Sequence, residues 1–307
     1  MKRLLSAIML FVLLIGMSTN VHAVDVKQSL SDEYEHEETG ITLPYRLIIP
    51  EIYDERYIFP LVVFFHGAGE RGLDNERQLD QCVQQIADNM PKAIILVPQC
   101  DGMSRWVETD WTKGGYSVDE IPESDEMMAV MDLIDEITKT YSVNKNTIYA
   151  AGISMGGFAV WDAVVRHNDV FAAGVAVCGA GDPSKAEVLK DTPMFVFHGA
   201  QDETVPVSGS TDMVEAIQAA GGTLVQYTEY GDGGHGIWGT VFNQEKLYKE
   251  LQKCELSDRY SPEKSGEQER PILPWILGGC ALALVLILLP LLVVILKKKS
   301  KAKKSEC

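Results

Sequence analysis

The chain has 307 residues, of which 46% are hydrophobic and 23% are charged, a composition that is ordinary for a globular protein. Its net charge of −17 argues against nucleic acids and anionic lipid headgroups as partners, because a strongly acidic protein repels both. Once the two ends are set aside, about 235 residues remain, which is within the range of a single α/β domain.

The first 23 residues have the layout of a secretory signal peptide. Lys2 and Arg3 precede an apolar run that ends at Met17, and small residues precede Val24. Cleavage after Ala23 is expected, since a charged start, a short apolar run and a small-residue site define such peptides. An uncleaved membrane anchor is the alternative, but the apolar run is short for a membrane span.

Strand-like and helix-like stretches alternate through residues 24–256, the predicted folded domain. An opening hairpin turns at Thr39 and Gly40, and unbroken apolar runs follow it. Such runs are typical of strands that are covered on both faces in a parallel sheet. The pattern predicts strands within residues 59–67, 93–99, 147–152, 171–181, 193–202 and 223–230, and helices near residues 75–88, 122–141, 156–167, 211–220 and 242–253. We therefore expect a doubly wound α/β fold, with a mostly parallel sheet and helices on both faces.

Three segments follow this domain. Residues 257–271 are polar and non-periodic, and we expect them to form an extracellular stalk. A transmembrane helix is predicted for residues 272–296, because the uncharged run within it is long enough to cross a ~30 Å hydrocarbon core. The tail at 297–307 contains six lysines, which places it in the cytoplasm by the positive-inside rule. The domain is thus predicted to lie outside the cell, and removing the charges of both ends leaves −24 on residues 24–270.

One serine of the domain is held among glycines. Gly152, Ser154 and Gly156 form a G-x-S-x-G sequence between a predicted strand and a predicted helix. In such a turn the serine hydroxyl is exposed, and the helix N-terminus and the next backbone N–H point toward the same place. Side chains at the glycine positions would collide with the strand and the helix. The motif predicts Ser154 as a nucleophile and the Met155 N–H as one donor of an oxyanion hole.

A serine nucleophile needs a base, and the base needs an acid that orients it. Asp202 follows an apolar strand, and His235 lies in a glycine-rich loop after the last strand. The order serine, acid, histidine, each just past the carboxyl end of a strand, is that of α/β-hydrolases. Asp182 also follows an apolar strand and is an alternative to Asp202. His66 and His198 follow strands too, but they do not fit this order and are interpreted as structural.

The loop after the first long strand, residues 66–72, is the expected source of the second oxyanion donor. Its glycines let the backbone approach a developing oxyanion, and the Ala68 N–H is the predicted donor. Glu70 and Arg71 are expected to pair with each other and so brace this loop.

Five ordered motifs resemble the esterase-like branch of the α/β-hydrolase superfamily: HGAGERG, ILVPQC, GISMGG, HGAQDETVP and GGHGIW. Over roughly residues 40–253 the chain is similar to the secreted feruloyl-esterase and phospholipase/carboxylesterase group, also described as prolyl-oligopeptidase-like. The resemblance implies that Ser154 is the nucleophile, Asp202 the acid and His235 the base. It also implies that Ala68 and Met155 supply the oxyanion donors. No segment matches a lid domain, a cap domain or a propeller.

Four cysteines lie in the predicted exported part of the chain: Cys82, Cys100, Cys178 and Cys254. They permit three disulfide pairings, among which the sequence does not choose, and free thiols are an equal alternative. No CxxC motif or His/Cys ligand spacing occurs, so no metal site is expected.

Together these features predict a membrane-tethered extracellular serine hydrolase that cleaves carboxylic esters through an acyl-enzyme, without a metal or an organic cofactor. The expected substrate is a small-molecule or polysaccharide-linked ester. Trp238 and Trp106 are candidates for contacts with it, and core packing is the alternative for each. A serine peptidase of the prolyl-oligopeptidase-like type and a catalytically silent cell-surface binding domain both stay open. The sequence does not indicate an oligomeric state.

Overall fold

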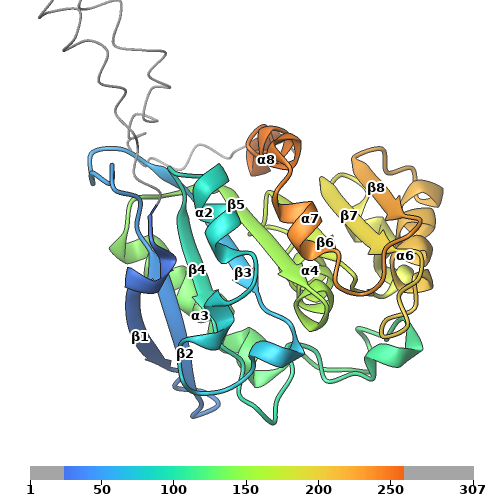
Figure 1. The fold of residues 1–307 in the computed structure, drawn as a ribbon, viewed down its shortest axis with the longest axis horizontal. Helices are drawn as coiled ribbons and strands as arrows, with labels where there is room; N and C mark the ends of the chain where they lie inside the picture. The colour runs from blue at the N-terminus through green and yellow to red at the C-terminus, as the bar shows by residue number, and fades with distance from the viewer. Residues whose placement is uncertain (1–23, 259–307) are drawn as a thin grey trace, which may run out of the picture. The chain divides into compact units, whose positions relative to one another are not determined.

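The computed structural model describes residues 24–258, in which eight strands form one sheet (Figure 1). The strand order is β1-β2-β4-β3-β5-β6-β7-β8; β2 is antiparallel to both β1 and β4, and all other neighbours are parallel. The strands are β1 Leu30–Glu35, β2 Thr42–Ile48, β3 Phe59–Phe65, β4 Ile94–Pro98, β5 Val143–Ile153, β6 Ala173–Val177, β7 Met194–Gly199 and β8 Val225–Tyr230. This confirms the predicted mostly parallel α/β sheet. The predicted signal peptide, most of the stalk, the transmembrane helix and the tail lie outside the described residues.

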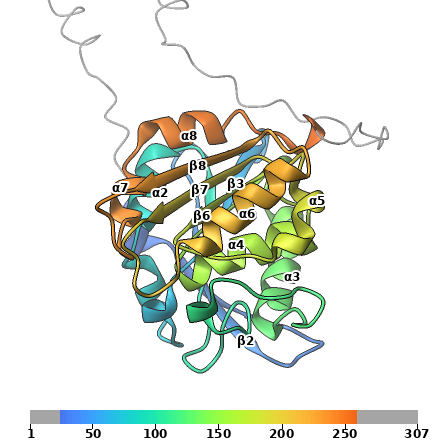
Figure 2. The same ribbon diagram turned by 90° about the vertical axis from the view of Figure 1, so that its right-hand side faces the viewer.

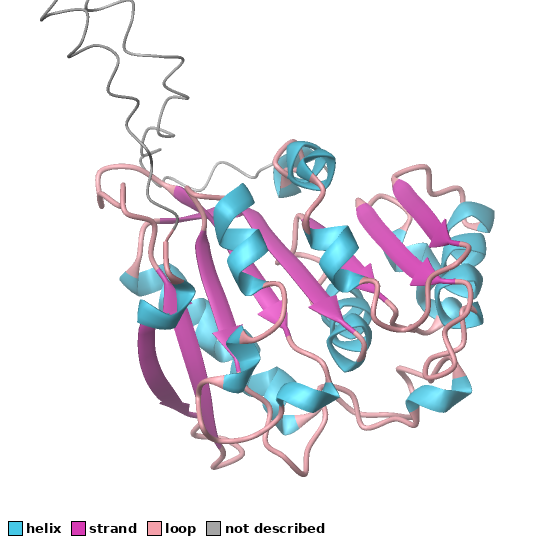
Figure 3. Ribbon diagram, viewed as in Figure 1, coloured by secondary structure: helices cyan, strands magenta, loops and turns pink. Residues whose placement is uncertain are grey.

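Helices cover both faces of the sheet, as Figures 2 and 3 show. On one face lie α2, α7 and α8, and on the other lie α3, α4, α5 and α6. Their bounds are α2 Val83–Asn89, α3 Asp125–Thr140, α4 Met155–Arg166, α5 Ala186–Leu189, α6 Ser208–Ala219, α7 Trp238–Phe242 and α8 Glu245–Leu251. Within residues 24–258, no helix combines the length and the apolarity that a membrane crossing requires.

The inner strands are buried because their sequences are apolar without alternation. Every residue of β4, β6 and β7 is buried, as expected for parallel strands covered on both faces. The edge strand β1 is mostly exposed and carries Asp32, Glu33 and Glu35. Charged side chains on an edge strand oppose its pairing with another chain.

One hydrophobic cluster lies between the sheet and helices α2, α7 and α8. It includes Phe64 of β3, Ile86 of α2, Phe242 of α7 and Leu251 of α8. The Phe64 and Phe242 rings meet edge to face, with centroids 5.8 Å apart, a geometry that aromatic pairs prefer. Fully burying a side chain of this size contributes about 1.5–3 kcal/mol to folding.

Three predicted helices have different boundaries in the structure. The one near 75–88 is interrupted, because Cys82 has a φ of 62° and separates a short 3-10 turn, Arg77–Leu79, from α2. Helix α3 begins at Asp125 rather than at residue 122, because the Ser124 hydroxyl caps it by accepting a bond from the Met127 N–H. The helix predicted near 242–253 is α8, which is shorter, and a separate helix that the sequence did not predict, α7, ends just before it at Phe242.

Candidate active site

Ser154 lies on the turn between β5 and α4, at the carboxyl edge of the sheet. Its φ of 53° and ψ of −120° are a conformation that costs a non-glycine residue about 1–3 kcal/mol. The Ser154 N–H donates to the Val177 carbonyl at 2.9 Å, and the Ser154 carbonyl accepts from the Gly157 N–H at 2.7 Å. These bonds to the end of β6 and to the first turn of α4 hold the serine in this strained pose.

Two glycines make this turn sterically possible. A Cβ on Gly156 would lie 1.9 Å from the Phe65 carbonyl oxygen, and one on Gly152 would lie 2.2 Å from the Gly156 carbonyl oxygen. Both obstacles are backbone atoms, so no side-chain rotation relieves them. Glycine at these positions therefore lets α4 start directly against β3 and β5.

The structure brings Ser154, His235 and Asp202 together in one chain of hydrogen bonds. His235 Nε2 lies 2.8 Å from Ser154 Oγ, and His235 Nδ1 lies 2.6 Å from Asp202 Oδ2. An ionised carboxylate accepts only, so its contact assigns the hydrogen to Nδ1 and leaves Nε2 free to accept the serine proton. The arrangement has the order and contacts that a serine nucleophile, a base and an orienting acid require.

Backbone hydrogen bonds fix the carboxylate of Asp202. Its Oδ1 accepts from the Thr204 N–H at 2.8 Å and from the Val205 N–H at 2.9 Å. Burial alone would raise the pKa of Asp202, but the bonds from His235, Val205 and Thr204 outweigh it and lower that pKa. Asp202 therefore stays ionised and can hold a protonated His235.

Asp182, the alternative acid, has a different task. Its carboxylate accepts from the Ser184 N–H at 3.0 Å and the Val118 N–H at 2.8 Å, and it thereby caps a short 3-10 turn and anchors a loop. It makes no contact with His235 among the interactions of residues 24–258. Of the two aspartates, only Asp202 meets the histidine.

The loop after β3 runs beside the serine. The point where Gly67 would carry a Cβ lies 3.6 Å from Ser154 Cβ. The Gly67 carbonyl accepts a bond from His66 Nδ1 at 2.6 Å. In a trans peptide the carbonyl and the next N–H point in opposite directions, so this bond also fixes the direction of the Ala68 N–H. Among the hydrogen bonds of residues 24–258, neither the Ala68 N–H nor the Met155 N–H donates to the protein, so both can donate to a ligand.

His66 is a buried neutral histidine. Its Nε2 accepts from the Cys100 N–H at 3.0 Å, so the ring hydrogen is on Nδ1 and points at the Gly67 carbonyl. Burial is the main cause that lowers the pKa of His66 to about 4. Its interpretation as structural fits these contacts, and its task is to hold the loop that carries Ala68.

The low pKa of His66 predicts a pH-dependent stability. Between pH 6.5 and about 4 the unfolded chain binds a proton that the folded chain resists, so the free energy of unfolding falls as pH falls, by up to about 3 kcal/mol. Urea unfolding at pH 7, 5.5 and 4 should show this loss in the wild type and a shallower loss in His66→Asn, which cannot titrate. Equal losses in both proteins would contradict the assignment.

Arg71 braces the loop, but not through Glu70. Its Nε donates to the Ala68 carbonyl at 3.0 Å and its Nη1 to the Ser104 carbonyl at 3.1 Å. The prediction that Glu70 and Arg71 pair with each other is wrong. Within the described residues, Arg71 donates its hydrogen bonds to these two carbonyls instead. Burial raises the pKa of Glu70, against the opposing bonds from the backbone N–H groups of Gly67 and Glu70 itself.

The two tryptophans predicted as substrate contacts, Trp238 and Trp106, differ in their exposure. Trp238 is partly exposed; its ring stands edge-on to that of His235 with centroids 5.4 Å apart, and its Nε1 donates to Gln81 Oε1 at 3.1 Å. Trp106 is fully buried, and its Nε1 donates to the His66 carbonyl at 3.2 Å. The prediction of Trp106 as a substrate contact is wrong, because its ring packs under the loop as core. Trp238 remains a candidate for contact with the substrate. Gln81, its hydrogen-bond partner, is a second candidate that no sequence motif indicated.

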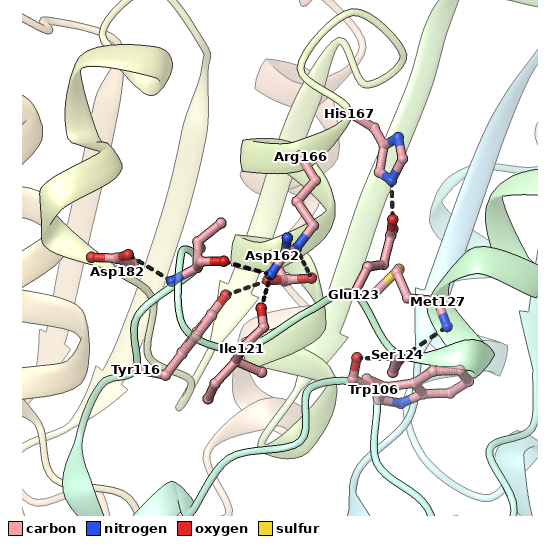
Figure 4. A network of polar contacts seen from close by, with 11 residues as sticks. Trp106, Tyr116, Ile121, Glu123, Ser124, Met127, Asp162, Arg166, His167 and Asp182 are labelled. Atoms are coloured by element: carbon pink, nitrogen blue, oxygen red, sulfur yellow. Dashed lines mark hydrogen bonds and ion pairs between the residues drawn. The ribbon is translucent and has the colours of Figure 1, made fainter.

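The polar network in Figure 4 binds the segment of residues 104–124 to helix α4. The Tyr116 hydroxyl donates to Asp162 Oδ1 at 3.0 Å, and Arg166 donates to Asp162 Oδ2 at 2.9 Å and to the Ile121 carbonyl at 2.6 Å. The Asp162 side chain is 1% exposed, and a buried charge persists only when paired in this way. The network therefore fixes the 104–124 segment on α4.

This segment carries an apolar wall that the sequence does not reveal. Its partly buried side chains pack on a small cluster formed by Val107, Phe158, Ala180 and Val205. Phe158 lies one helical turn beyond Ser154, and Val205 accompanies Asp202, so the cluster lies next to the hydrogen-bonded triad. The side chains that the segment adds to it are Trp111, Tyr116 and Ile121.

Three of the four cysteines are buried free thiols: Cys82, Cys100 and Cys178. The bridge between Cys82 and Cys100, left open by the sequence, does not form. Burial raises the pKa of Cys82 and of Cys178 to about 12. These thiols behave as small apolar side chains of the core.

Comparison with known families decides the classification. The sequence profile of the phospholipase/carboxylesterase family matches residues 54–255, which is more than half of the chain. The chain belongs to the phospholipase/carboxylesterase family. This membership confirms the predicted resemblance and the predicted class, a hydrolase of the α/β-hydrolase superfamily.

Alignments with individual relatives cover only parts of this chain. The bifunctional acetylxylan esterase/xylanase XynS20E of Neocallimastix patriciarum is 23% identical over 146 residues, which is 48% of this chain and 20% of the relative. A thermostable esterase of known structure is 33% identical with a TM-score of 0.66, and the match covers 75% of this chain and 64% of that one. A ferulic acid esterase shares the fold at 19% identity and a TM-score of 0.55, over 73% of this chain and 96% of that one. The chain thus spans a fifth of the curated relative and less than two thirds of the thermostable esterase.

Proposed function

We propose that this protein hydrolyses carboxylic esters through an acyl-enzyme formed on Ser154. The supporting observation is the unbroken hydrogen-bond chain from Ser154 Oγ through His235 to Asp202, at the carboxyl edge of the sheet. Membership of a carboxylesterase family supports the same reaction. The triad alone does not select esters over amides, so the choice of ester rests on the family.

The proposed reaction has two halves. Ser154 Oγ attacks the ester carbonyl while its proton moves to His235 Nε2, and the Ala68 and Met155 N–H groups stabilise the oxyanion. The carbon–oxygen bond to the alcohol then breaks, and the alcohol leaves with the proton from Nε2. Water next attacks the acyl-enzyme, giving its proton to Nε2, and the carboxylic acid leaves as Ser154 recovers that proton. Throughout, Asp202 holds the imidazole and stabilises its charged form.

We further propose a small-molecule or polysaccharide-linked ester as substrate. The curated relative named as an acetylxylan esterase supports an ester on a polysaccharide. The apolar wall beside the triad and the exposed part of Trp238 suit an acyl or aromatic group.

A substrate panel tests the proposed reaction. We expect kcat/KM of the isolated domain for p-nitrophenyl acetate and methyl ferulate to exceed that for matching p-nitroanilides by at least about 10³-fold, because the amine is the poorer leaving group. A fluorophosphonate probe should label Ser154 and block turnover. Comparable amide turnover would favour a peptidase instead, and absence of both labelling and turnover would favour a silent binding domain.

For the whole chain we propose a single-pass membrane protein with its catalytic domain outside the cell. The charged and apolar start, the uncharged run at 274–296 and the lysines after it support this topology. A membrane-impermeant fluorophosphonate should label Ser154 on intact cells that express the full chain. Labelling that requires cell lysis would overturn this placement.

A further inference from the structure

A second histidine contacts the carboxylate of the proposed triad. His198, near the end of β7, has its Nε2 3.2 Å from Asp202 Oδ2, the oxygen that also contacts His235 Nδ1 at 2.6 Å. The side chains of His198 and Asp202 are both fully buried. The contact therefore lies in a setting where water does not screen it.

The partners of His198 assign its hydrogen atoms. Nε2 faces the Val205 carbonyl at 3.1 Å as well as Asp202 Oδ2, and both of these atoms only accept. Nε2 therefore carries a hydrogen, which it donates to the Val205 carbonyl, while Asp202 Oδ2 lies within 3.2 Å of the same nitrogen. Nδ1 lies 2.7 Å from the Ser210 hydroxyl, which is a donor as well as an acceptor. The same hydroxyl also lies 3.2 Å from the Gly179 carbonyl, which accepts from it. Burial is the main cause that lowers the pKa of His198, which favours a neutral ring whose one hydrogen is on Nε2.

The triad carboxylate thus lies close to several titratable groups. His235 comes from the loop after β8, His198 from β7, and the thiol of Cys178 from the end of β6 also hydrogen-bonds Asp202. These are the titratable groups that face the carboxylate in the described structure. The high pKa of Cys178, about 12, keeps its thiol neutral over any ordinary assay range, so the thiol does not change the charge beside Asp202.

We propose that His198 is a positioning residue that limits how strongly Asp202 acts on His235. The N–H dipole of His198, with its nitrogen 3.2 Å from Oδ2, offsets part of the carboxylate's negative charge, and the buried ring restrains rotation of the carboxylate about the Cβ–Cγ bond. His235 then loses its proton more easily and keeps the orientation that faces Ser154. The inference rests on the proposed ester hydrolysis because the assay measures that reaction. The contact between His198 and Asp202 does not depend on the identity of the substrate.

The pH profile of kcat/KM distinguishes this role from simple packing. In His198→Leu the carboxylate lacks this N–H dipole and holds the charged form of His235 longer, so the acid limb should move up by about half a pH unit and kcat should fall about 3- to 10-fold. His198→Gln restores an N–H near the Nε2 position and should return the limb toward that of the wild type. Ser210→Ala, the matched control, removes the partner of Nδ1 but leaves the Nε2–H beside Asp202, so its acid limb should match that of the wild type.

A measurement on the wild-type protein covers the case in which the leucine variant does not fold. Nitrogen-15 spectra of the histidine rings should show His198 as the neutral form with its hydrogen on Nε2 at pH 7. A hydrogen on Nδ1 instead overturns the proposal, since Nε2 would then present a lone pair rather than an N–H to Asp202. A folded His198→Leu enzyme with the acid limb of the wild type overturns it as well. If instead Ser154→Ala keeps full activity, the proposed reaction fails and the tautomer result stands by itself.

Discussion

Ser154→Ala should lower kcat/KM for p-nitrophenyl acetate by about 10⁴- to 10⁶-fold, the range that removal of a serine nucleophile produces in hydrolases with a triad. The loss is large because the hydrogen bond between Ser154 Oγ and His235 Nε2, 2.8 Å long, has no substitute once the hydroxyl is gone. A residual rate is expected, since the oxyanion donors and the binding surface are left in place.

The control for this experiment is Ser184→Ala, which removes an exposed hydroxyl away from the triad. It should hydrolyse the ester like the wild type, and both variants should keep the wild-type circular dichroism spectrum. Ester turnover by Ser154→Ala within 10-fold of the wild type would remove the basis of the acyl-enzyme proposal. Loss of fluorophosphonate labelling should accompany the loss of turnover.

Gly156→Ala should destabilise the domain by more than about 4 kcal/mol or prevent its folding, an effect in the extreme tail for a single added methyl group. The methyl carbon would lie 1.9 Å from the Phe65 carbonyl oxygen and 2.8 Å from that of His66. Relief requires α4 to move away from β3, which breaks the packing of a helix buried along most of its length.

Urea unfolding measures this effect. Gly239→Ala in α7 is the matched control, because no atom lies within 4 Å of its added methyl group and its φ is not in the left-handed region. Alanine favours a helix over glycine by up to about 1 kcal/mol, so this control should be neutral or slightly stabilising. Equal unfolding midpoints for Gly156→Ala and the wild type would show that α4 does not approach β3 as described.

The triad was within reach of the sequence because its chemistry restricts residue type and order. Ser154, Asp202 and His235 each follow a strand, and parallel strands bring their carboxyl ends to one edge. The family resemblance favoured Asp202 over Asp182, but the residues alone left both open, because both follow apolar strands. Only contacts between residues distant in the chain separate the acid that meets His235 from the one that caps a turn.

Other features were beyond sequence reasoning for identifiable physical reasons. The interruption before α2 depends on the left-handed backbone conformation of Cys82. Cysteine has no preference for that conformation, so the sequence does not predict it. The sequence around Trp106 does not show whether its side chain lines a pocket or packs in the core. Its complete burial in the structure assigns it to the core. The placement of the 104–124 segment depends on the pairing of Tyr116 and Arg166 with Asp162, which no local pattern encodes.

The buried thiols limit how the protein tolerates heat. While the chain is folded, Cys82, Cys100 and Cys178 are shielded from oxidants, and their high pKa values leave almost no reactive thiolate. Once the domain opens, all three become available for cross-linking between molecules, which refolding cannot reverse. Its working lifetime in air is therefore governed by how fast it opens rather than by the equilibrium between its two states.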